Sequence, residues 1–331
     1  MDNYVPPFQI TNIMLDRVSS IMKKIGKLDN YKDLNKMPIL RRNNRIKSIH
    51  SSLAIEANSL SYEQVKDVID GKIVIGPKNE IQEVKNAYNA YLKMGEVDPY
   101  SIKDLKETHG IMTYLTVEES GKFRNGNEGV FDENGNCIHV CPSPSEIDKL
   151  MNDLFKWMTD NKENIHPLIL SSVFHYEFVF IHPFSDGNGR MARLWQNVIL
   201  SNWEKIFEYV PIESEIMKYQ EEYYSSIRNC NLKGESTEFI EFILRMIDEV
   251  LDGIVIGVGN QVNHISSYVK KLMDVMESGI PYTTQELMEM LDMKSRISFR
   301  ENYLIPALEN GLVKMSFPDS PTSKNQTYYK A

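Results

Sequence analysis

The nonapeptide HPFSDGNGR, from His182 to Arg190, gathers a histidine, an acid, an amide, two glycines and an arginine between two apolar stretches. The preceding stretch reads PLILSSVFHYEFVFI and the following one reads MARLWQNVIL, and both patterns predict core helices. A residue that precedes a proline is disfavoured in helical geometry, so the first helix must stop before Pro183. The nonapeptide is therefore predicted to be a short connection, with His182 projecting into it from a helix end.

The glycine-rich half of this connection has the composition of an anion site. Gly187 and Gly189 allow backbone N–H groups to turn toward one point, and the helix that follows adds partial positive charge. Arg190 and Arg193 lie three positions apart, so both guanidinium groups face the same side of that helix. Because guanidinium groups match the oxygens of phosphates, this half is predicted to bind a polyphosphate.

The other polar side chains of the connection suggest group transfer from that polyphosphate. Asp186 is the kind of residue that holds Mg²⁺ beside phosphates. His182 is suited to remove the proton of an incoming hydroxyl near neutral pH. Phe184 is expected to anchor the turn in the core. Together they predict nucleotidyl or phosphoryl transfer, and the alternative is a polar connection without chemistry.

The stretch HPFSDGNGRMAR resembles, at every fixed position, the HPFx[D/E]GNGRxxR signature of Fic-domain proteins. Most Fic enzymes transfer AMP from ATP to a Ser, Thr or Tyr hydroxyl of a protein. The resemblance implies that His182 is the general base and Asp186 the ligand of Mg²⁺ or Mn²⁺. It further implies phosphate contacts, with Asn188 at the α-phosphate, Gly187 and Gly189 in the anion site, and Arg190 and Arg193 at the β- and γ-phosphates. Members that act as kinases carry Lys in place of Gly189, so the glycine favours AMP transfer, although members that use CDP-choline are not excluded.

A second feature is the Gly-, Asn- and Pro-rich segment 121–144. Short β-prone runs at 127–131 and 137–141 flank the sequence Asp132-Glu133-Asn134-Gly135, which predicts a β-hairpin. The hairpin resembles the flap of Fic proteins, which pairs with the backbone of the target protein and steers its hydroxyl to the histidine. An ordinary surface hairpin is the alternative.

The segment SSLAIEAN, residues 51–58, indicates a built-in inhibitor. Ser52 and Glu56 lie one turn apart on a predicted helix over about 41–57, which is expected to end at Ala57-Asn58 with Asn58 as a left-handed cap. The segment is similar to the inhibitory motif [S/T]xxxE[G/N] of the Fic family, except for Ala57. The resemblance implies that Glu56 pairs with Arg193 and displaces the γ-phosphate. Alternatively, Glu56 positions water to remove AMP from a modified target, or it is a solvated helical residue.

Three further groups of residues are less specific. Tyr223, Tyr224 and Asn197 fall where Fic proteins place residues near the adenine, but core packing is an equal alternative for the tyrosines. Cys137, His139 and Cys141 alternate on a predicted strand and could form part of a metal site, although a fourth ligand is missing. In the last helical region, the basic residues that could meet a phosphate backbone are Lys294, Arg296 and Arg300.

The totals describe an acidic globular protein of 331 residues, with 42% hydrophobic residues, 25% charged residues and a formal net charge of −9. This charge argues against nonspecific nucleic-acid binding. Three cysteines are too few for a disulfide framework, no stretch is long and apolar enough for a membrane span, and no signal peptide is recognised, so we expect a cytoplasmic protein without membrane contact.

The overall expectation is a mainly α protein with a Fic-fold helical core, a β-hairpin flap and a small C-terminal winged-helix domain. The predicted boundaries are 1–95 for an N-terminal helical region with the inhibitory helix, 96–258 for the catalytic domain, and 262–331 for the winged helix. The last region carries eight basic and eight acidic residues, so protein docking or regulation is favoured over a DNA-binding regulator. Self-modification is expected, and a homo-oligomer is possible.

Overall fold

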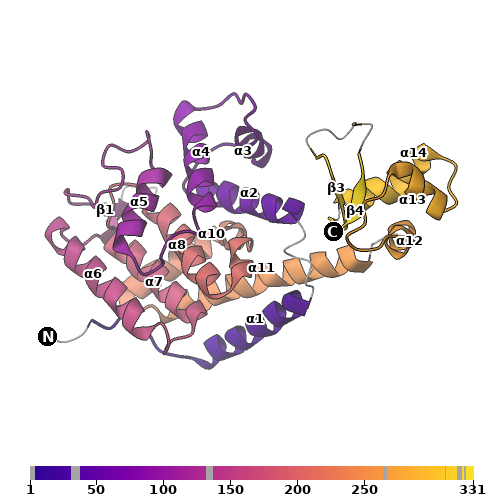
Figure 1. Cartoon of the computed structure of the whole chain (residues 1–331). Helices are drawn as coiled ribbons and strands as arrows, with labels where there is room; N and C mark the ends of the chain where they lie inside the picture. Colours follow the sequence, from indigo (N-terminus) through magenta and orange to yellow (C-terminus); the bar gives the residue numbers. More distant parts are fainter. Residues whose placement is uncertain are drawn as a thin grey trace. The chain divides into compact units, whose positions relative to one another are not determined.

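The computed structural model describes residues 4–30, 38–131, 137–263, 267–309, 311–318, 323 and 326–331. The chain divides into two compact units (Figure 1). The first contains residues up to 25 and residues 43–251, and the second contains residues 26–42 and 252 onward. The inhibitory helix and the catalytic loop both fall in the first unit, while the predicted domain boundaries at 95 and 258 remain predictions.

Helices build the first unit almost entirely. In chain order it contains α1 (Asn12–Asn30), α2 (Pro38–Ile55), α3 (Tyr62–Ile69), α4 (Lys78–Leu92), α5 (Ile102–Met112), β1 (Gly129–Phe131), β2 (Cys137–Val140), α6 (Pro144–Asn161), α7 (Pro167–Ile181), α8 (Asn188–Trp203), a 3-10 helix (Lys205–Glu208), α9 (Ile212–Lys218), α10 (Gln220–Lys233) and α11 (Thr237–Asn263), with α1, α2 and α11 extending across the unit boundary. The mainly α fold is confirmed. Helices α9 and α10 are separated at Tyr219, whose backbone leaves helical geometry.

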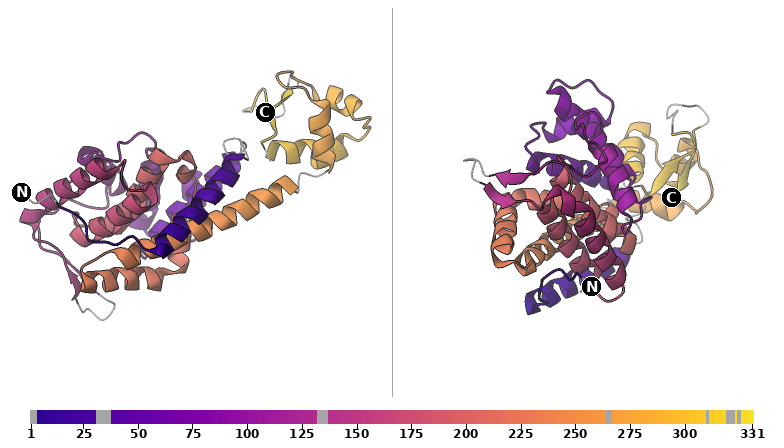
Figure 2. Two further views of the ribbon diagram at one scale, coloured as in Figure 1. Left: turned by 90° about the horizontal axis from the view of Figure 1, so that it is seen from below. Right: turned by 90° about the vertical axis from the view of Figure 1, so that its left-hand side faces the viewer.

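The centre of the first unit is the pair α7 and α8, which pack closely on each other. Nearly every side chain of α7 is buried, because this helix is apolar on all sides and must be surrounded by other helices. On the outside, α1 lies along α11 in each view (Figure 2), where Arg17 and Lys24 both contact Asp248 at 2.7 Å. The loop between α7 and α8 is therefore held between two helices of the core.

The predicted hairpin is present as an antiparallel pair of short strands. Gly129 pairs with Val140 and Val130 with His139, and the register shifts between Val130 and Phe131. The turn predicted at 132–135 lies outside the described residues. Pro142 and Pro144 follow β2, and α6 starts with Pro144 in its first turn, as the sequence predicts.

The second unit has its own hydrophobic core. Helices α12 (Ser267–Val275), α13 (Thr284–Met290) and α14 (Arg296–Phe299), a π-helical turn (Arg300–Leu304) and α15 (Ile305–Glu309) precede the antiparallel strands β3 (Val313–Met315) and β4 (Tyr328–Lys330). Leu272, Leu287 and Phe299 are fully buried in its core. The order of helices followed by two strands agrees with the sequence, and the winged-helix class stays a prediction. Lys294, Arg296 and Arg300 are exposed.

Within the described part of the chain, none of the helices combines the length and the apolar character that a bilayer crossing requires.

Candidate active site

His182 lies at the C-terminal end of α7 in a left-handed backbone conformation, with φ 51° and ψ 58°. Its N–H still donates to Phe178 O at 3.0 Å, so the helix ends at this residue, as predicted from Pro183. A left-handed conformation costs a non-glycine residue roughly 1–2 kcal/mol. The surrounding structure must therefore hold this backbone in place, and that strain is a common property of functional positions.

The environment of His182 favours the neutral imidazole. Burial lowers the pKa of His182 below the usual value for histidine, and the positive charge of Arg124 lowers this pKa further. The Nδ1 atom lies 3.4 Å from Val179 O, which suits a tautomer with the proton on Nδ1. Nε2 is then the atom that can accept a proton from a substrate.

The turn after His182 is fixed by bonds within the loop. Asn188 closes it, because its Oδ1 accepts from Phe184 N at 2.9 Å and its Nδ2 donates to Phe184 O at 2.7 Å. The Phe184 ring is fully buried, which agrees with its predicted role as the anchor of the turn. Gly187 adopts φ 80°, and α8 begins directly after it. The N-terminus of α8 is thus presented at a rigid turn, as an anion site requires.

Arg193 is bound by the inhibitory helix α2. Its Nε donates to Ser52 Oγ at 3.0 Å, and its Nη2 donates to Ser52 O at 2.9 Å and to Glu56 Oε1 at 2.8 Å. The Arg193 side chain is only 1% exposed, whereas that of Glu56 is 34% exposed. The structure therefore brings together Ser52, Glu56 and Arg193, the residues that the inhibitory motif implies.

The carboxylate of Glu56 occupies the space above Gly189. A Cβ atom built on Gly189 would lie 2.2 Å from Glu56 Oε1 and 3.1 Å from Arg193 Nη1. Arg193 Nη1 is buried and has no hydrogen-bond partner among the described residues. An unpartnered buried cation donor beside a bare glycine is a place where an anion can bind, and Glu56 supplies an anion there from within the chain.

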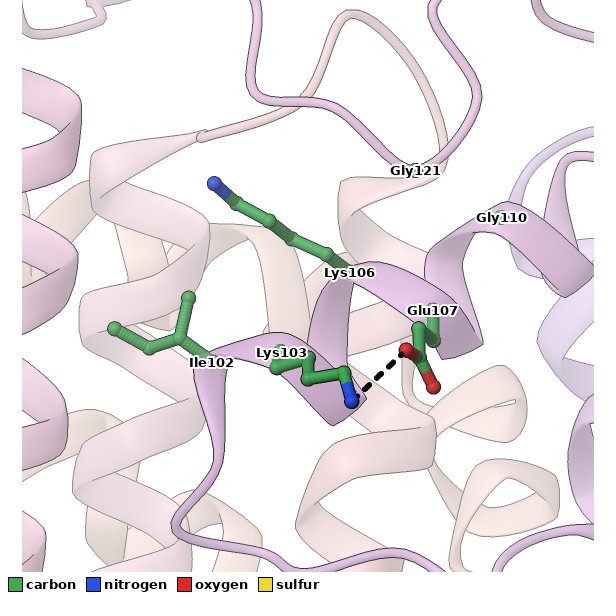
Figure 3. A pocket seen from close by; sticks show the side chains of 6 residues that line it. All are labelled: Ile102, Lys103, Lys106, Glu107, Gly110 and Gly121. Atoms are coloured by element: carbon green, nitrogen blue, oxygen red, sulfur yellow. Dashed lines mark ion pairs between the residues drawn. The ribbon is translucent and has the colours of Figure 1, made fainter.

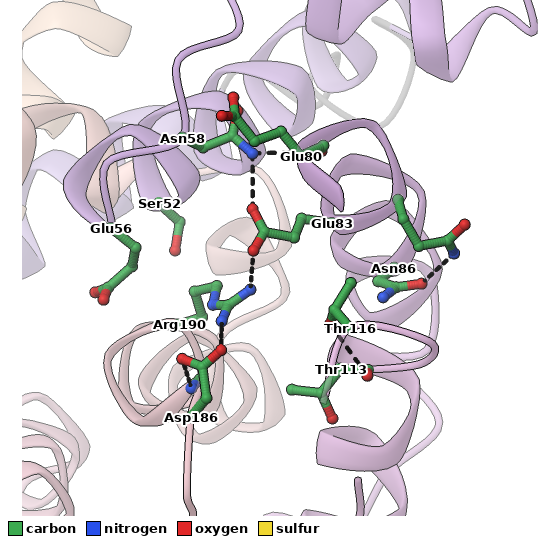
Figure 4. A network of polar contacts seen from close by, with 12 residues as sticks. Ser52, Glu56, Asn58, Glu80, Glu83, Asn86, Thr113, Thr116, Asp186 and Arg190 are labelled. Carbon is green, nitrogen blue, oxygen red and sulfur yellow. Dashed lines mark hydrogen bonds and ion pairs between the residues drawn. The ribbon is translucent and has the colours of Figure 1, made fainter. Parts of the chain in front are cut away.

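Arg190 is bound by two carboxylates, one of which the sequence does not point to. Its Nη2 lies 3.0 Å from Asp186 Oδ2, and its Nη1 lies 3.3 Å from Glu83 Oε1 on α4. Glu83 in turn accepts from Asn58 Nδ2 at 2.8 Å, so a polar chain runs from the end of the inhibitory segment to the catalytic loop (Figure 4). Glu83 carries no motif, and its contact with Arg190 spans more than a hundred positions.

The end of the inhibitory helix differs from the expected cap. The left-handed residue is Ala57, with φ 63°, and not Asn58. Ala57 stands where the family motif has Gly or Asn, the residues that adopt this conformation most readily. Asn58 is buried and uses its side chain to contact Glu83. The departure from the motif thus leaves the helix end intact and adds a local strain.

Two of the three residues assigned to the adenine side are buried. Tyr223 is 2% exposed and lies 3.0 Å from His175 Nε2 through its hydroxyl, which agrees with the core-packing alternative. Asn197 is 2% exposed and donates to Glu213 Oε1 at 2.7 Å. The adenine-side role of both residues stays a prediction. Tyr224 is 42% exposed, and its hydroxyl donates to Ile55 O, so it stays a candidate.

The structure gives no support to a metal site on β2. His139 Nε2 lies 2.8 Å from Phe180 O, and the side chain of Cys137 lies outside the described part. The described residues contain no group of three or more His, Cys, Asp or Glu side chains that could hold a metal ion. Asp186 is half-exposed, with a side chain 56% accessible.

A helical core that holds a histidine next to a loop rich in glycine and arginine, with a short hairpin nearby, is the architecture of the Fic fold. Residues 99–200 match the Fic/DOC family, and residues 267–329 match the family described as Filamentation induced by cAMP protein Fic-like, C-terminal domain. The crystal structure of a Fic family protein from Desulfovibrio desulfuricans G20 is 39% identical, with a TM-score of 0.74, and covers 99% of this chain and 98% of that chain. This chain belongs to the Fic family.

Curated relatives align with this chain over part of their own length. Protein adenylyltransferase Fic from Nematostella vectensis is 27% identical over 257 residues, which are 74% of this chain and 56% of that protein. The protein of the same name from Aedes aegypti is 30% identical over 217 residues, which are 62% of this chain and 41% of that protein. The chain therefore spans about half the length of these relatives.

Proposed function

We propose that this protein transfers AMP from ATP to a Ser, Thr or Tyr hydroxyl of a target protein and of itself. The observation that carries the proposal is the juxtaposition of a half-buried His182, whose pKa is lowered, with two arginines that keep unpartnered donors among the described residues, Arg190 Nε and Arg193 Nη1. Relatives named protein adenylyltransferase support this reaction over other transfers from a polyphosphate.

The phosphate groups of ATP fit the charges of the loop. Arg193 and Arg190 would bind the γ- and β-phosphates, Gly187 and Gly189 would turn backbone N–H groups toward them, and the remaining amide hydrogen of Asn188 would reach the α-phosphate. Asp186 is a half-exposed carboxylate beside Arg190, and Mg²⁺ commonly binds through one carboxylate, phosphate oxygens and water. Bound there, Mg²⁺ or Mn²⁺ would neutralise charge on the phosphates.

The transfer proceeds by attack of the hydroxyl oxygen on the α-phosphorus. His182 Nε2 accepts the hydroxyl proton as the new oxygen–phosphorus bond forms, and the bond from the α-phosphorus to the bridging oxygen breaks. Pyrophosphate leaves and AMP remains on the protein hydroxyl. Because burial lowers the pKa of His182, the base is neutral and ready at pH 7.

The target segment would bind along the hairpin. The strands β1 and β2 form a sheet of two strands, so each strand has an edge that is not paired within the hairpin. An extended segment can add to such an edge through backbone hydrogen bonds with little demand on its sequence. The Val140 side chain of β2 is 77% exposed and gives this edge an apolar contact.

Glu56 would restrain the reaction by competition. Its carboxylate holds Arg193 with a charge-assisted hydrogen bond and fills the space above Gly189, where a phosphate oxygen would otherwise sit. The second candidate function is the removal of AMP from a modified target. Glu56 Oε1 binds Arg193 while the side chain remains one-third exposed, so its other oxygen can orient a water molecule.

The first experiment is the intact mass of the purified protein after incubation with ATP and Mg²⁺. Glu56→Gly should gain AMP faster than wild type, and His182→Ala should gain none. Glu96→Gly, at an exposed turn residue, is the matched control and should behave as wild type. Failure of every variant to gain AMP, alone or with candidate protein substrates, would contradict the transfer. Release of AMP from a modified protein by wild type, lost in Glu56→Gly, would identify the second function.

A further inference from the structure

Arg124 is a buried cation whose hydrogen-bond partners, among the described residues, are backbone carbonyl groups. It is 3% exposed. Its Nε donates to His182 O, its Nη1 to Gly126 O and its Nη2 to Pro142 O, each at 2.7 Å. Among the described residues it forms no ion pair with a carboxylate. The three carbonyls come from three places: the catalytic histidine, the residues before β1 and the residues after β2.

The backbone around Arg124 is joined to the same loop. Arg124 N donates to Pro183 O at 2.9 Å, directly after the histidine. His109 accepts from Gly121 N at 2.9 Å through Nδ1, and its Nε2 lies 3.0 Å from Asp186 O. Burial lowers the pKa of His109 to about 4, so its ring stays neutral and can make both contacts near pH 7. The base of the hairpin and the catalytic loop are thus tied at two points.

Aromatic packing fills the space between these ties. The His109 ring stacks on Phe184 at 3.6 Å between centroids, and Phe123 packs against Phe184 at 5.3 Å. Lys106 Nζ lies over the Phe123 ring at 3.7 Å, at the side of the shallow pocket that α5 forms with Gly121 (Figure 3). The segment 121–124 is therefore anchored to the core through Gly121, Phe123 and Arg124, and the hairpin extends from it.

We propose that Arg124 is the positioning residue that fixes the catalytic histidine relative to the hairpin. Its bond to His182 O holds the left-handed backbone of the base, and its bonds to Gly126 O and Pro142 O hold both ends of the hairpin at a constant distance from that base. This inference rests on the proposed function, because the hairpin is taken to carry the target hydroxyl. Nothing in the loop signature or the inhibitory motif assigns this role.

The chemistry of the guanidinium group explains why an arginine is present. A planar group with donors on three nitrogen atoms reaches three carbonyls that lie in different directions, whereas the ammonium group of lysine is a single point. Loss of the side chain would remove the shared donor of the His182, Gly126 and Pro142 carbonyls and so release the histidine from both ends of the hairpin. Arg124→Lys therefore retains the charge and loses the geometry, and Arg124→Gln loses both.

The test combines hydrogen exchange and kinetics on the full chain in the Glu56→Gly background. Leu154→Ala, a cavity variant in α6, is the control for a simple loss of stability. In both Arg124 variants, amide exchange should accelerate together at 126–131, 137–142 and 182–184, relative to the rest of the chain. The kcat for AMP transfer should fall about tenfold to a hundredfold, as expected for a misplaced base, with little change in the KM for ATP. Leu154→Ala should lower Tm without this pattern.

Two results would overturn the proposal. One is faster exchange in the hairpin with unchanged exchange at 182–184, because the two parts would then be uncoupled. The other is a rescue by Arg124→Lys to the parent kcat, because charge alone would then suffice. If the Glu56→Gly parent transfers no AMP, the proposed function fails while the exchange measurement still decides whether Arg124 couples the two segments.

Discussion

The two ends of the catalytic loop are held by different kinds of partner. At the base end, His182 is fixed by Arg124 and by its own helix through bonds to neutral backbone carbonyl and N–H groups. At the phosphate end, Arg193 and Arg190 are bound by the carboxylates of Glu56, Glu83 and Asp186. A neutral carbonyl does not compete with ATP, whereas a carboxylate is an anion that phosphate can replace. The contacts at the base end therefore keep His182 in place, whereas the carboxylates at the phosphate end can be replaced by phosphate.

This difference separates catalysis from its control. Buried arginines need anionic or polar partners at all times, because an unpaired buried charge is costly. In the protein without nucleotide, the carboxylates pair with these arginines. ATP must therefore bind the arginines more strongly than the carboxylates do. Under the proposed function, the same arginines would bind the substrate and respond to the position of the inhibitory helix, while the geometry of His182 would not change with that exchange.

The largest expected effect belongs to the base end. His182→Ala should lower the rate of AMP transfer by about 10²- to 10⁴-fold, the usual contribution of a general base. Because the alanine leaves the arginines untouched, the Kd for ATP should change little in the Glu56→Gly background. Single-turnover transfer and calorimetric titration with ATP measure the two quantities. Loss of ATP binding together with transfer would mean that the two ends are not independent.

At the phosphate end, Glu56→Gly should raise the rate of transfer. A hydrogen bond between charged groups contributes about 1.5–3 kcal/mol, so its removal should increase transfer or productive ATP binding by about tenfold to a hundredfold. The measurement is initial rate against ATP concentration, with Glu96→Gly as control. Equal rates for wild type and Glu56→Gly would show that the contact with Arg193 does not restrain the enzyme.

A methyl group at position 189 tests whether phosphate and Glu56 use the same space. In the Glu56→Gly background there is no carboxylate to displace, so the methyl group of Gly189→Ala meets only Arg193 Nη1, at 3.1 Å, and the bound ATP. We expect its Kd for ATP to rise about tenfold, because the methyl occupies the anion site at the start of α8. Calorimetric titration measures this. Undiminished ATP affinity would place the phosphates elsewhere.

Much of this site could be predicted from local sequence. The end of α7 before Pro183, the start of α8 after Gly187 and the hairpin strands all follow from residue types within a few positions, and the contact of Glu56 with Arg193 follows from two recognisable motifs. Glu83 and Arg124 carry no such signal, because their partners lie on other elements and are partly backbone atoms. The burial of Tyr223 and Asn197 could not be predicted, because spacing along a helix does not reveal which neighbour covers its face.

A smaller effect should follow from the second pair at the phosphate end. Glu83 is 23% exposed and lies 3.3 Å from Arg190, a looser contact than that of Glu56 with Arg193. Glu83→Gln in the Glu56→Gly background should tighten ATP binding about twofold to fivefold, since a single polar contact contributes about 0.5–1 kcal/mol net. Glu80→Gln is the control, because Glu80 accepts from Ser59 and not from an arginine. Weaker ATP binding in Glu83→Gln would mean that Glu83 orients Arg190 and does not compete for it.

The smallest effect is the pH dependence at the base end. Burial lowers the pKa of His182 below its usual value of 6.5, and only the neutral imidazole accepts the proton of the hydroxyl. The rate should therefore rise with pH below 6.5, as His182 loses its proton, and change by less than about twofold between pH 7 and 8. Arg124→Gln removes a nearby positive charge, so the rising limb of its profile should move toward higher pH. The ratio of transfer rates at pH 6 and pH 8, measured with saturating ATP in the Glu56→Gly background, checks both statements. An unchanged limb in Arg124→Gln would show that Arg124 acts on the base through geometry alone.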